Sequence, residues 1–223
     1  MSVVIDMTKS NLTGVIDYGV GNVRSVCSAV EAVGGRPVLS SDPAELLGCD
    51  RLILPGVGAF AHGTAQLRSR GLDTAVKTAV SDGKPLLGIC LGMQMLAQSS
   101  LEFGESDGLG LAQGVVSLIQ SPDPARTLRL PHVAWKKLER KSDAAGWLFD
   151  GVDPDARFYF IHSYAVPAAS PDVVAVAEID GSEFAAVLAV DNVVGTQFHP
   201  EKSGPQGLKM LKNFVMQEDM IHV

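Results

Sequence analysis

The strongest constraint on the fold is the alternation of short β-branched runs with a helical pattern along the first part of the chain. Thr13–Ile16, Arg36–Leu39, Arg51–Leu54 and Pro85–Ile89 are expected to be strands. The last of these is a continuous apolar run, as in strands buried on both faces of a parallel sheet. Between the first two, Gly21–Val33 repeats apolar residues at helical spacing. This βαβα order predicts an α/β fold, with a mostly parallel sheet covered by helices on both faces.

The pattern changes after about residue 110, where strand-like runs follow one another with little helix between them. We therefore expect antiparallel or mixed strands to be added to the parallel core. A last helix is expected at Gly207–Gln217, with Leu208, Leu211, Phe214 and Val215 facing inward. The expected strands of this half are Gly114–Ile119, Ala156–Ile161, Val173–Ala177, Ala185–Leu188 and Val193–Phe198, and Pro122–Pro124 marks a loop.

Composition argues for one folded domain and against two classes of partner. Of the 223 residues, 46% are apolar and 19% are charged, and no linker or repeat divides them. We expect a domain at residues 13–223 after a short extension, residues 1–12, which lacks the features of a secretory signal. The net charge of −7 disfavours nucleic-acid binding. No apolar run approaches the roughly 20 residues that span a membrane.

The cysteines point to a reducing compartment. Cys27, Cys49 and Cys90 are sparse and irregularly spaced, so we expect reduced thiols in a cytoplasmic protein. No Cys/His pair has zinc spacing, and we expect neither a metal nor a cofactor. Cys27 on the apolar face of a helix and Cys49 in a loop are expected to be inert.

Cys90 is the exception, because it stands in Gly88-Ile89-Cys90-Leu91-Gly92 at the junction of a buried strand and a helix expected at Leu91–Gln98. A sharp strand-to-helix turn holds its central side chain in a strained, exposed position and needs small flanking residues. The helix N-terminus favours the thiolate over the thiol, whose usual pKa is about 8.5. The alternative reading is a buried cysteine packed between two glycines.

A thiol nucleophile needs a base, and the base needs a group that orients it. His199-Pro200-Glu201 follows the last apolar strand. In an extended segment, residues two apart point the same way, so His199 and Glu201 are expected on one face with Pro200 stiffening the link. The alternative is a loop histidine beside a solvated glutamate.

A glycine-rich loop, Leu54–Phe60, follows the third strand and contains Pro55-Gly56-Val57-Gly58. Its N–H groups are candidates for stabilising an oxyanion. A phosphate loop is the rival interpretation, but no Lys-Ser/Thr follows, so this is not a Walker motif. A second turn, Asp17–Asn22, starts like a dinucleotide fingerprint, yet Arg24 replaces its last glycine.

Gly88–Gln94 together with Gln197–Lys202 resembles the class I (triad) glutamine amidotransferase family, and the glycine-rich loop precedes both motifs as it does in that family. The resemblance covers nearly the whole chain after residue 12. It implies a flavodoxin-like fold and a catalytic triad of Cys90, His199 and Glu201.

Further motifs resemble one subfamily, the glutaminase subunits of imidazole glycerol phosphate synthase. They are Asp17–Asn22, Pro131–Trp135 and Phe158–Tyr164. The resemblance places His132 and His162 near the rim of the site. It also implies oxyanion donors at Gly58 and Leu91, glutamine contacts at Gln94, Glu102, Ser163 and Tyr164, and a partner interface near Asn22, Trp135 and Lys202. The chain departs from this pattern where Ala134 and Lys136 stand in place of the usual glycine and asparagine.

The subfamily resemblance implies that glutamine is hydrolysed through a γ-glutamyl thioester, and that the ammonia passes to a (β/α)8 cyclase subunit in histidine biosynthesis. The chain itself offers no phosphate-cradling motif for an ammonia acceptor. Three alternatives stay open. They are the glutaminase of another pathway, such as anthranilate, aminodeoxychorismate or pyridoxal phosphate synthesis, a γ-glutamyl peptidase that needs no acceptor, and a binding module with a degenerate site.

Overall fold

The computed structural model describes residues 11–217, so residues 1–10 of the predicted extension lie outside it. Leu12, the last residue of that extension, is already the first residue of a strand. The strands are β1 Leu12–Ile16, β2 Arg36–Ser40, β3 Arg51–Leu54, β4 Leu86–Ile89, β5 Ser99–Ser100, β6 Ser106–Asp107, β7 Val115–Leu118, β8 His132–Lys137, β9 Glu139–Arg140, β10 Arg157–His162, β11 Tyr164–Ala165, β12 Val173–Ile179, β13 Ser182–Val190 and β14 Val193–Thr196. The helices are α1 Val23–Ala32, α2 Pro43–Leu47, α3 Phe60–Ser69, α4 Leu72–Ser81, α5 Leu91–Leu96, α6 Gly204–Met216 and the short 3₁₀ turns η1 Gly146–Phe149 and η2 Pro200–Lys202.

The core is an eight-stranded sheet in the order β2-β1-β3-β4-β14-β13-β12-β9. Its first five strands are parallel, and β13, β12 and β9 continue it in antiparallel pairing. The sheet therefore confirms both sequence predictions, a parallel first half and antiparallel strands added in the second. Among the described residues, no helix has the length and hydropathy that crossing a bilayer requires.

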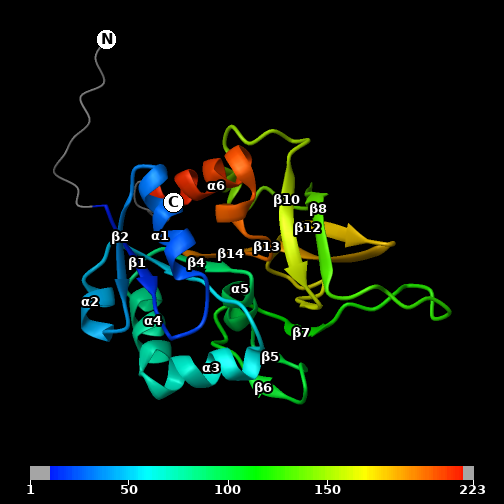
Figure 1. Cartoon of the computed structure of the whole chain (residues 1–223), viewed down its shortest axis with the longest axis horizontal. Helices are drawn as coiled ribbons and strands as arrows, with labels where there is room; N and C mark the ends of the chain where they lie inside the picture. The colour runs from blue at the N-terminus through cyan, green and yellow to red at the C-terminus, as the bar shows by residue number, and fades with distance from the viewer. Residues whose placement is uncertain (1–10, 218–223) are drawn as a thin grey trace, which may run out of the picture.

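Helices cover both faces of the sheet because alternate strand residues point to opposite sides. Val15 and Ile53 pack with the residues of α1 and α6, whereas Ile16 and Leu52 pack with those of α2, α3 and α4. In Figure 1, α1 and α6 accordingly lie on one side of the sheet, and α3 and α4 lie on the other. The strand β4, Leu86–Ile89, is accordingly buried at all four of its positions.

Several elements differ from the predictions. The helix after Cys90 ends at Leu96, because Ala97 has the extended ψ of 170°. Two helices that periodicity did not single out, α3 and α4, connect β3 to β4. The expected strand at Ala156–Ile161 is β10, but it pairs with β8 in a separate two-stranded sheet beside the core. The last helix begins at Gly204, earlier than expected. Leu211, Phe214 and Val215 are buried as predicted, whereas Leu208 is only partly buried and Met210 is buried in addition.

The order of the parallel strands brings distant segments to one edge. The strand β4 lies between β3 and β14, with Gly88 opposite Leu54 on one side and Ile89 opposite Thr196 on the other. Just beyond these carboxyl ends begin the glycine-rich loop after β3, the Cys90 turn after β4 and the His199 segment after β14. Carboxyl ends of parallel strands are where ligand sites form in such sheets.

Candidate active site

Cys90 occupies a strained turn between β4 and α5. Its φ of 54° and ψ of −110° lie outside the regions that side chains with a Cβ normally adopt. Glycine is required at positions 88 and 92 because other backbone atoms approach these residues closely. A Cβ added to Gly92 would lie 1.8 Å from the carbonyl oxygen of Leu54, and one added to Gly88 would lie 2.8 Å from the α5 backbone. The predicted strained turn with small neighbours is confirmed, but the predicted exposure of its central side chain is wrong, because Cys90 is only 6% exposed.

The thiol of Cys90 is surrounded by polar groups, although the residue is buried. The side-chain amide of Gln197 donates from Nε2 to Cys90 Sγ at 3.7 Å, and the carbonyl oxygen of Ile161 lies 4.0 Å from the same sulfur. Burial raises the pKa of the Cys27 and Cys49 thiols and favours their protonated form, in agreement with the expectation that both are inert.

His199 and Glu201 form a buried pair. His199 Nδ1 and Glu201 Oε1 are 2.8 Å apart, and both side chains are almost fully excluded from solvent. Burial alone lowers the pKa of His199, but interactions with the Cys90 sulfur and with Glu201 outweigh it and raise the pKa to about 9. The structure thus places Glu201 in hydrogen-bond contact with the imidazole, and the Cys90 sulfur close enough to raise the pKa of His199. The second imidazole nitrogen, Nε2, is buried and has no hydrogen-bond partner among the described residues.

The local geometry of this pair differs from the expected extended segment. His199 is extended, but Pro200–Lys202 turn into the 3₁₀ helix η2. Glu201 therefore reaches back to the imidazole across a turn instead of lying beside it on a strand face. The hydroxyl of Ser203 donates to the carbonyl of His199 at 2.6 Å, and the His199 N–H donates to the carbonyl of Tyr159 at 3.0 Å. These bonds hold the histidine backbone from both sides.

The glycine-rich loop between β3 and α3 lies against the Cys90 turn. Gly58 has a φ of +93° and open space around its missing side chain, so its backbone conformation alone calls for glycine. A Cβ on Gly56 would lie 2.6 Å from the hydroxyl of Tyr18 and 2.9 Å from the N–H of Gly92. The loop and the turn are thus packed backbone to backbone, as an oxyanion site requires.

Tyr18 is a site residue that sequence reasoning missed. Its hydroxyl donates to the carbonyl of Pro55 at 2.8 Å, which holds the start of the glycine-rich loop. Burial and then the nearby Cys90 raise the pKa of Tyr18, so the hydroxyl keeps its proton for this bond. The signal available in the sequence was its position inside the Asp17–Asn22 turn.

The predicted glutamine contacts belong to two separate groups of hydrogen bonds. Gln94 is buried in α5 and donates from Nε2 to the carbonyl of Tyr164 at 2.8 Å and to Gln197 Oε1 at 3.0 Å. Ser163 forms the bend between β10 and β11. Glu102 belongs to the second group. It lies between β5 and β6, and its Oε2 accepts a hydrogen bond from the first N–H of α3. Gln197, whose amide joins this network to the sulfur, was quoted in the sequence motif but given no role.

The residues predicted for a partner interface are exposed. Trp135 is 47% exposed on β8, where its ring packs against that of Tyr159. Asn22 precedes α1 without capping it, and Lys202 ends the turn η2, beside which α1 packs. Alanine at position 134, where the family usually has glycine, does not strain the backbone, because this residue lies in β8 and does not have a positive φ.

The family resemblance placed His132 and His162 near the rim of the site. Both are buried, with ring centroids 5.6 Å apart, among Phe160 and Phe184. Burial is the main cause that lowers the pKa of His162 to about 3, and neighbouring His132 and His199 add to the effect. Burial thus favours the neutral form of both histidines, and Nδ1 of His162 lies 3.0 Å from the carbonyl oxygen of Tyr164.

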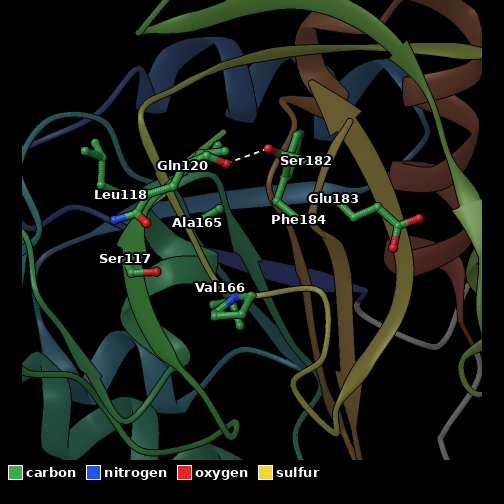
Figure 2. Close-up of a pocket in the computed structure, with 10 residues that line it drawn as sticks. Ser117, Leu118, Gln120, Ala165, Val166, Ser182, Glu183 and Phe184 are labelled. Atoms are coloured by element: carbon green, nitrogen blue, oxygen red, sulfur yellow. Dashed lines mark hydrogen bonds between the residues drawn. The ribbon is translucent and has the colours of Figure 1, made fainter. Parts of the chain in front are cut away.

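A cavity of about 300 Å³ lies apart from the triad, between β7, β11 and the start of β13 (Figure 2). The hydroxyl of Ser182 donates to the carbonyl of Gln120 across it. None of the predicted site residues lines it. Its lining consists of Ser117, Leu118, Ile119, Gln120, Ala165, Val166, Pro167, Ser182, Glu183 and Phe184.

Comparison with known proteins identifies the family of the chain. Residues 14–218 match the family model "Glutamine amidotransferase class-I". Proteins named imidazole glycerol phosphate synthase subunit HisH are 41% identical in Sulfurimonas denitrificans, over 91% of this chain and 97% of the relative, and 44% identical in Methanosarcina barkeri, over 90% and 96%. One similar solved structure is described as a glutamine amidotransferase; it has a TM-score of 0.66 and 20% identity, over 92% of this chain and 97% of that one. Another is PurLQS from Thermotoga maritima, with a TM-score of 0.65 and 22% identity, over 92% of this chain and 97% of that one. The two solved structures support the fold. The chain belongs to the class-I glutamine amidotransferase family, in which its sequence groups with the HisH subunits of imidazole glycerol phosphate synthase.

Proposed function

We propose that this chain is the glutaminase subunit of imidazole glycerol phosphate synthase, and that it hydrolyses glutamine to glutamate and ammonia with Cys90 as nucleophile. The observation that carries the proposal is the buried imidazole of His199, which is held by Glu201 and has its pKa raised to about 9 by the Cys90 sulfur and that carboxylate despite burial. Such an imidazole is a proton acceptor for a thiol and keeps the resulting charge pair stable at neutral pH.

In the proposed reaction, His199 takes the proton of Cys90, and the thiolate attacks the side-chain carboxamide carbon of glutamine. Collapse of the tetrahedral intermediate breaks the C–N bond, while the imidazolium gives its proton to the departing ammonia. A γ-glutamyl thioester remains. Water then attacks the thioester carbonyl as His199 accepts a proton, and glutamate leaves with regeneration of the Cys90 thiol. Glu201 keeps the imidazole oriented through both halves of the reaction.

The oxyanion of each tetrahedral intermediate would be bound between the glycine-rich loop and the start of α5. Leu91 is the first residue of α5, and Gly58 has the open, positive-φ backbone that lets an N–H be directed at a ligand. A single such donor contributes about 2.7–4 kcal/mol to stabilisation of the transition state. We assign the two donors to these backbone N–H groups.

The proposed partner is the cyclase subunit that uses the ammonia, and both subunits are assigned to the cytoplasm. Support comes from the outer face of the two-stranded sheet, where Val133, Trp135 and Ile161 are exposed side by side. This apolar face lies next to the triad, because Ile161 contributes the carbonyl beside the Cys90 sulfur. A partner docked there would receive ammonia directly instead of losing it to solvent.

The test measures ammonia release from glutamine by the purified complex with the cyclase. Cys90→Ala is expected to abolish release without loss of folding, whereas Cys27→Ala, a matched change at a thiol in α1 that is not part of the proposed triad, is expected to retain it. Activity of the isolated chain is expected to be low and to rise when the cyclase and its nucleotide ligand are added. Unchanged release by the Cys90 variant, or rapid cleavage of γ-glutamyl peptides without any partner stimulation, would overturn the proposal.

A further inference from the structure

The helix α3, which begins where the glycine-rich loop ends, has no cap of its own. Its first residue is Phe60, and Ala59 at the N-cap position has no side chain that accepts a hydrogen bond. The first turn of α3 also carries no acidic residue. Because the first N–H groups of a helix have no partner within the helix, they need an acceptor from elsewhere.

Glu102 supplies that acceptor from a loop that is 42 positions away in the chain. Its Oε2 accepts the N–H of Phe60 at 2.7 Å. The hydroxyl of Ser100 accepts the N–H of Glu102 at 3.1 Å, which holds the backbone of this loop. Within the described part of the chain, no other hydrogen bond or ion pair to the second oxygen, Oε1, is formed.

The loop that carries Glu102 also borders the predicted glutamine contacts. Phe103, directly after it, has a positive φ of 54° and places its ring edge-on to Tyr164, with centroids 6.3 Å apart. Tyr164 in turn accepts the hydrogen bond from Gln94. Glu102 therefore lies between the start of α3 on one side and the Tyr164 strand on the other.

The bonds at the two ends of the glycine-rich loop matter because Gly58, within the loop, has no side chain to pack. Nothing lies within 4 Å of the position that a Gly58 side chain would occupy, so no side-chain packing holds this residue. The loop is instead tied at its two ends, at Pro55 by the Tyr18 hydroxyl and at Phe60 by Glu102. Loss of either bond frees backbone whose N–H groups must be in place before the reaction begins.

We propose that Glu102 is a positioning residue for the glycine-rich loop, and that it couples the amino-acid end of the bound glutamine to the oxyanion donor at Gly58. The proposal rests on the proposed function and deepens it. When Oε1 binds the α-ammonium group of glutamine, the carboxylate becomes fixed while Oε2 keeps the Phe60 N–H. Substrate binding thereby orders the loop that stabilises the oxyanion, in addition to holding the substrate.

Three substitutions separate this role from simple substrate binding. Glu102→Gln keeps an oxygen for Phe60 but loses the negative charge. Glu102→Asp keeps the charge but, being one methylene shorter, withdraws the oxygen from Phe60. Glu102→Ala loses both, and Glu105→Ala, at an exposed carboxylate in the same loop, is the matched control.

The first readout is amide hydrogen exchange at residues 57–62 in the complex with the cyclase. The Ala and Asp variants are expected to exchange roughly 3–10-fold faster there, the range that corresponds to one hydrogen bond, and the Gln variant close to the wild-type rate. The second readout is glutamine hydrolysis. The Ala and Asp variants are expected to lose roughly 3–10-fold in kcat, whereas the Gln variant raises KM and largely keeps kcat.

The proposal would be overturned if the Ala and Asp variants kept the wild-type exchange at residues 57–62 and the wild-type kcat, with only KM raised. That result would show that Glu102 does no more than bind the ammonium group. Failure of the proposed function is distinguishable, because the wild-type complex would then release no ammonia from glutamine. The exchange measurement would in that case still report whether Glu102 holds the loop.

Discussion

Gly92→Ala tests whether the contact between the Cys90 turn and the end of β3 sets the geometry of the site. The added Cβ would lie 1.8 Å from the carbonyl oxygen of Leu54 and 2.8 Å from its carbonyl carbon. Both atoms are backbone in the centre of the sheet, so no side-chain rotation relieves the clash. The start of α5 and the end of β3 must separate by about 1.2 Å to reach 3.0 Å, below which real Cβ contacts are essentially absent.

This separation has a cost in stability and a larger cost in rate. Overpacking of a close-packed interior typically costs about 1–3 kcal/mol, and the better helix propensity of alanine returns up to about 1 kcal/mol. We expect a net loss of about 1–2 kcal/mol in the free energy of unfolding, which corresponds to a decrease in Tm of roughly 2–8 °C for a domain of this size. Displacement of reacting groups by about 1 Å is expected to lower kcat by about 100-fold.

The assay combines thermal unfolding with glutamine hydrolysis by the complex. Gly146→Ala is the matched control, because the nearest atom to its added Cβ is a guanidinium nitrogen of Arg140 at an ordinary 3.5 Å. The control is expected to leave kcat unchanged. If Gly92→Ala retained the wild-type kcat, the close approach of the two segments would not determine the active geometry, and the reasoning from backbone contact would be wrong.

Two further predictions concern the groups around Cys90. Since the folded pKa of His199 is raised above the value of about 6.5 for an unfolded histidine, its stabilising contribution is full below pH 6.5 and is lost as the pH rises through about 9. In Glu201→Gln, NMR titration of the His199 ring is expected to give a lower pKa, and the fall in stability is expected to begin at a lower pH. An unchanged titration would refute the role given to the Glu201 carboxylate. Tyr18→Phe removes the bond to the Pro55 carbonyl, so we expect a loss of about 1 kcal/mol in unfolding free energy and a several-fold lower kcat, measured by denaturant unfolding and glutamine hydrolysis. Wild-type values for both would mean that this bond does not hold the loop.

The sequence by itself determined what depends on residues close together in the chain. The apolar run before Cys90 and the glycines on either side of it predicted a strand, a sharp turn and a reactive cysteine, because strand burial and turn geometry are local requirements. The histidine and the glutamate two residues later were also found locally. Even there, the reason given was wrong, since η2 and not an extended segment brings Glu201 to the imidazole.

Only the tertiary structure decided what depends on which strands become neighbours. Cys90 meets His199 because β14 pairs with β4, and Glu102 reaches the start of α3 because its loop folds back across 42 positions. The burial of His132 and His162 and the raised pKa of His199 likewise depend on side chains from several segments. Periodicity describes which face of an element is apolar, whereas strand order and the charges around a buried group result from the packing of the whole chain.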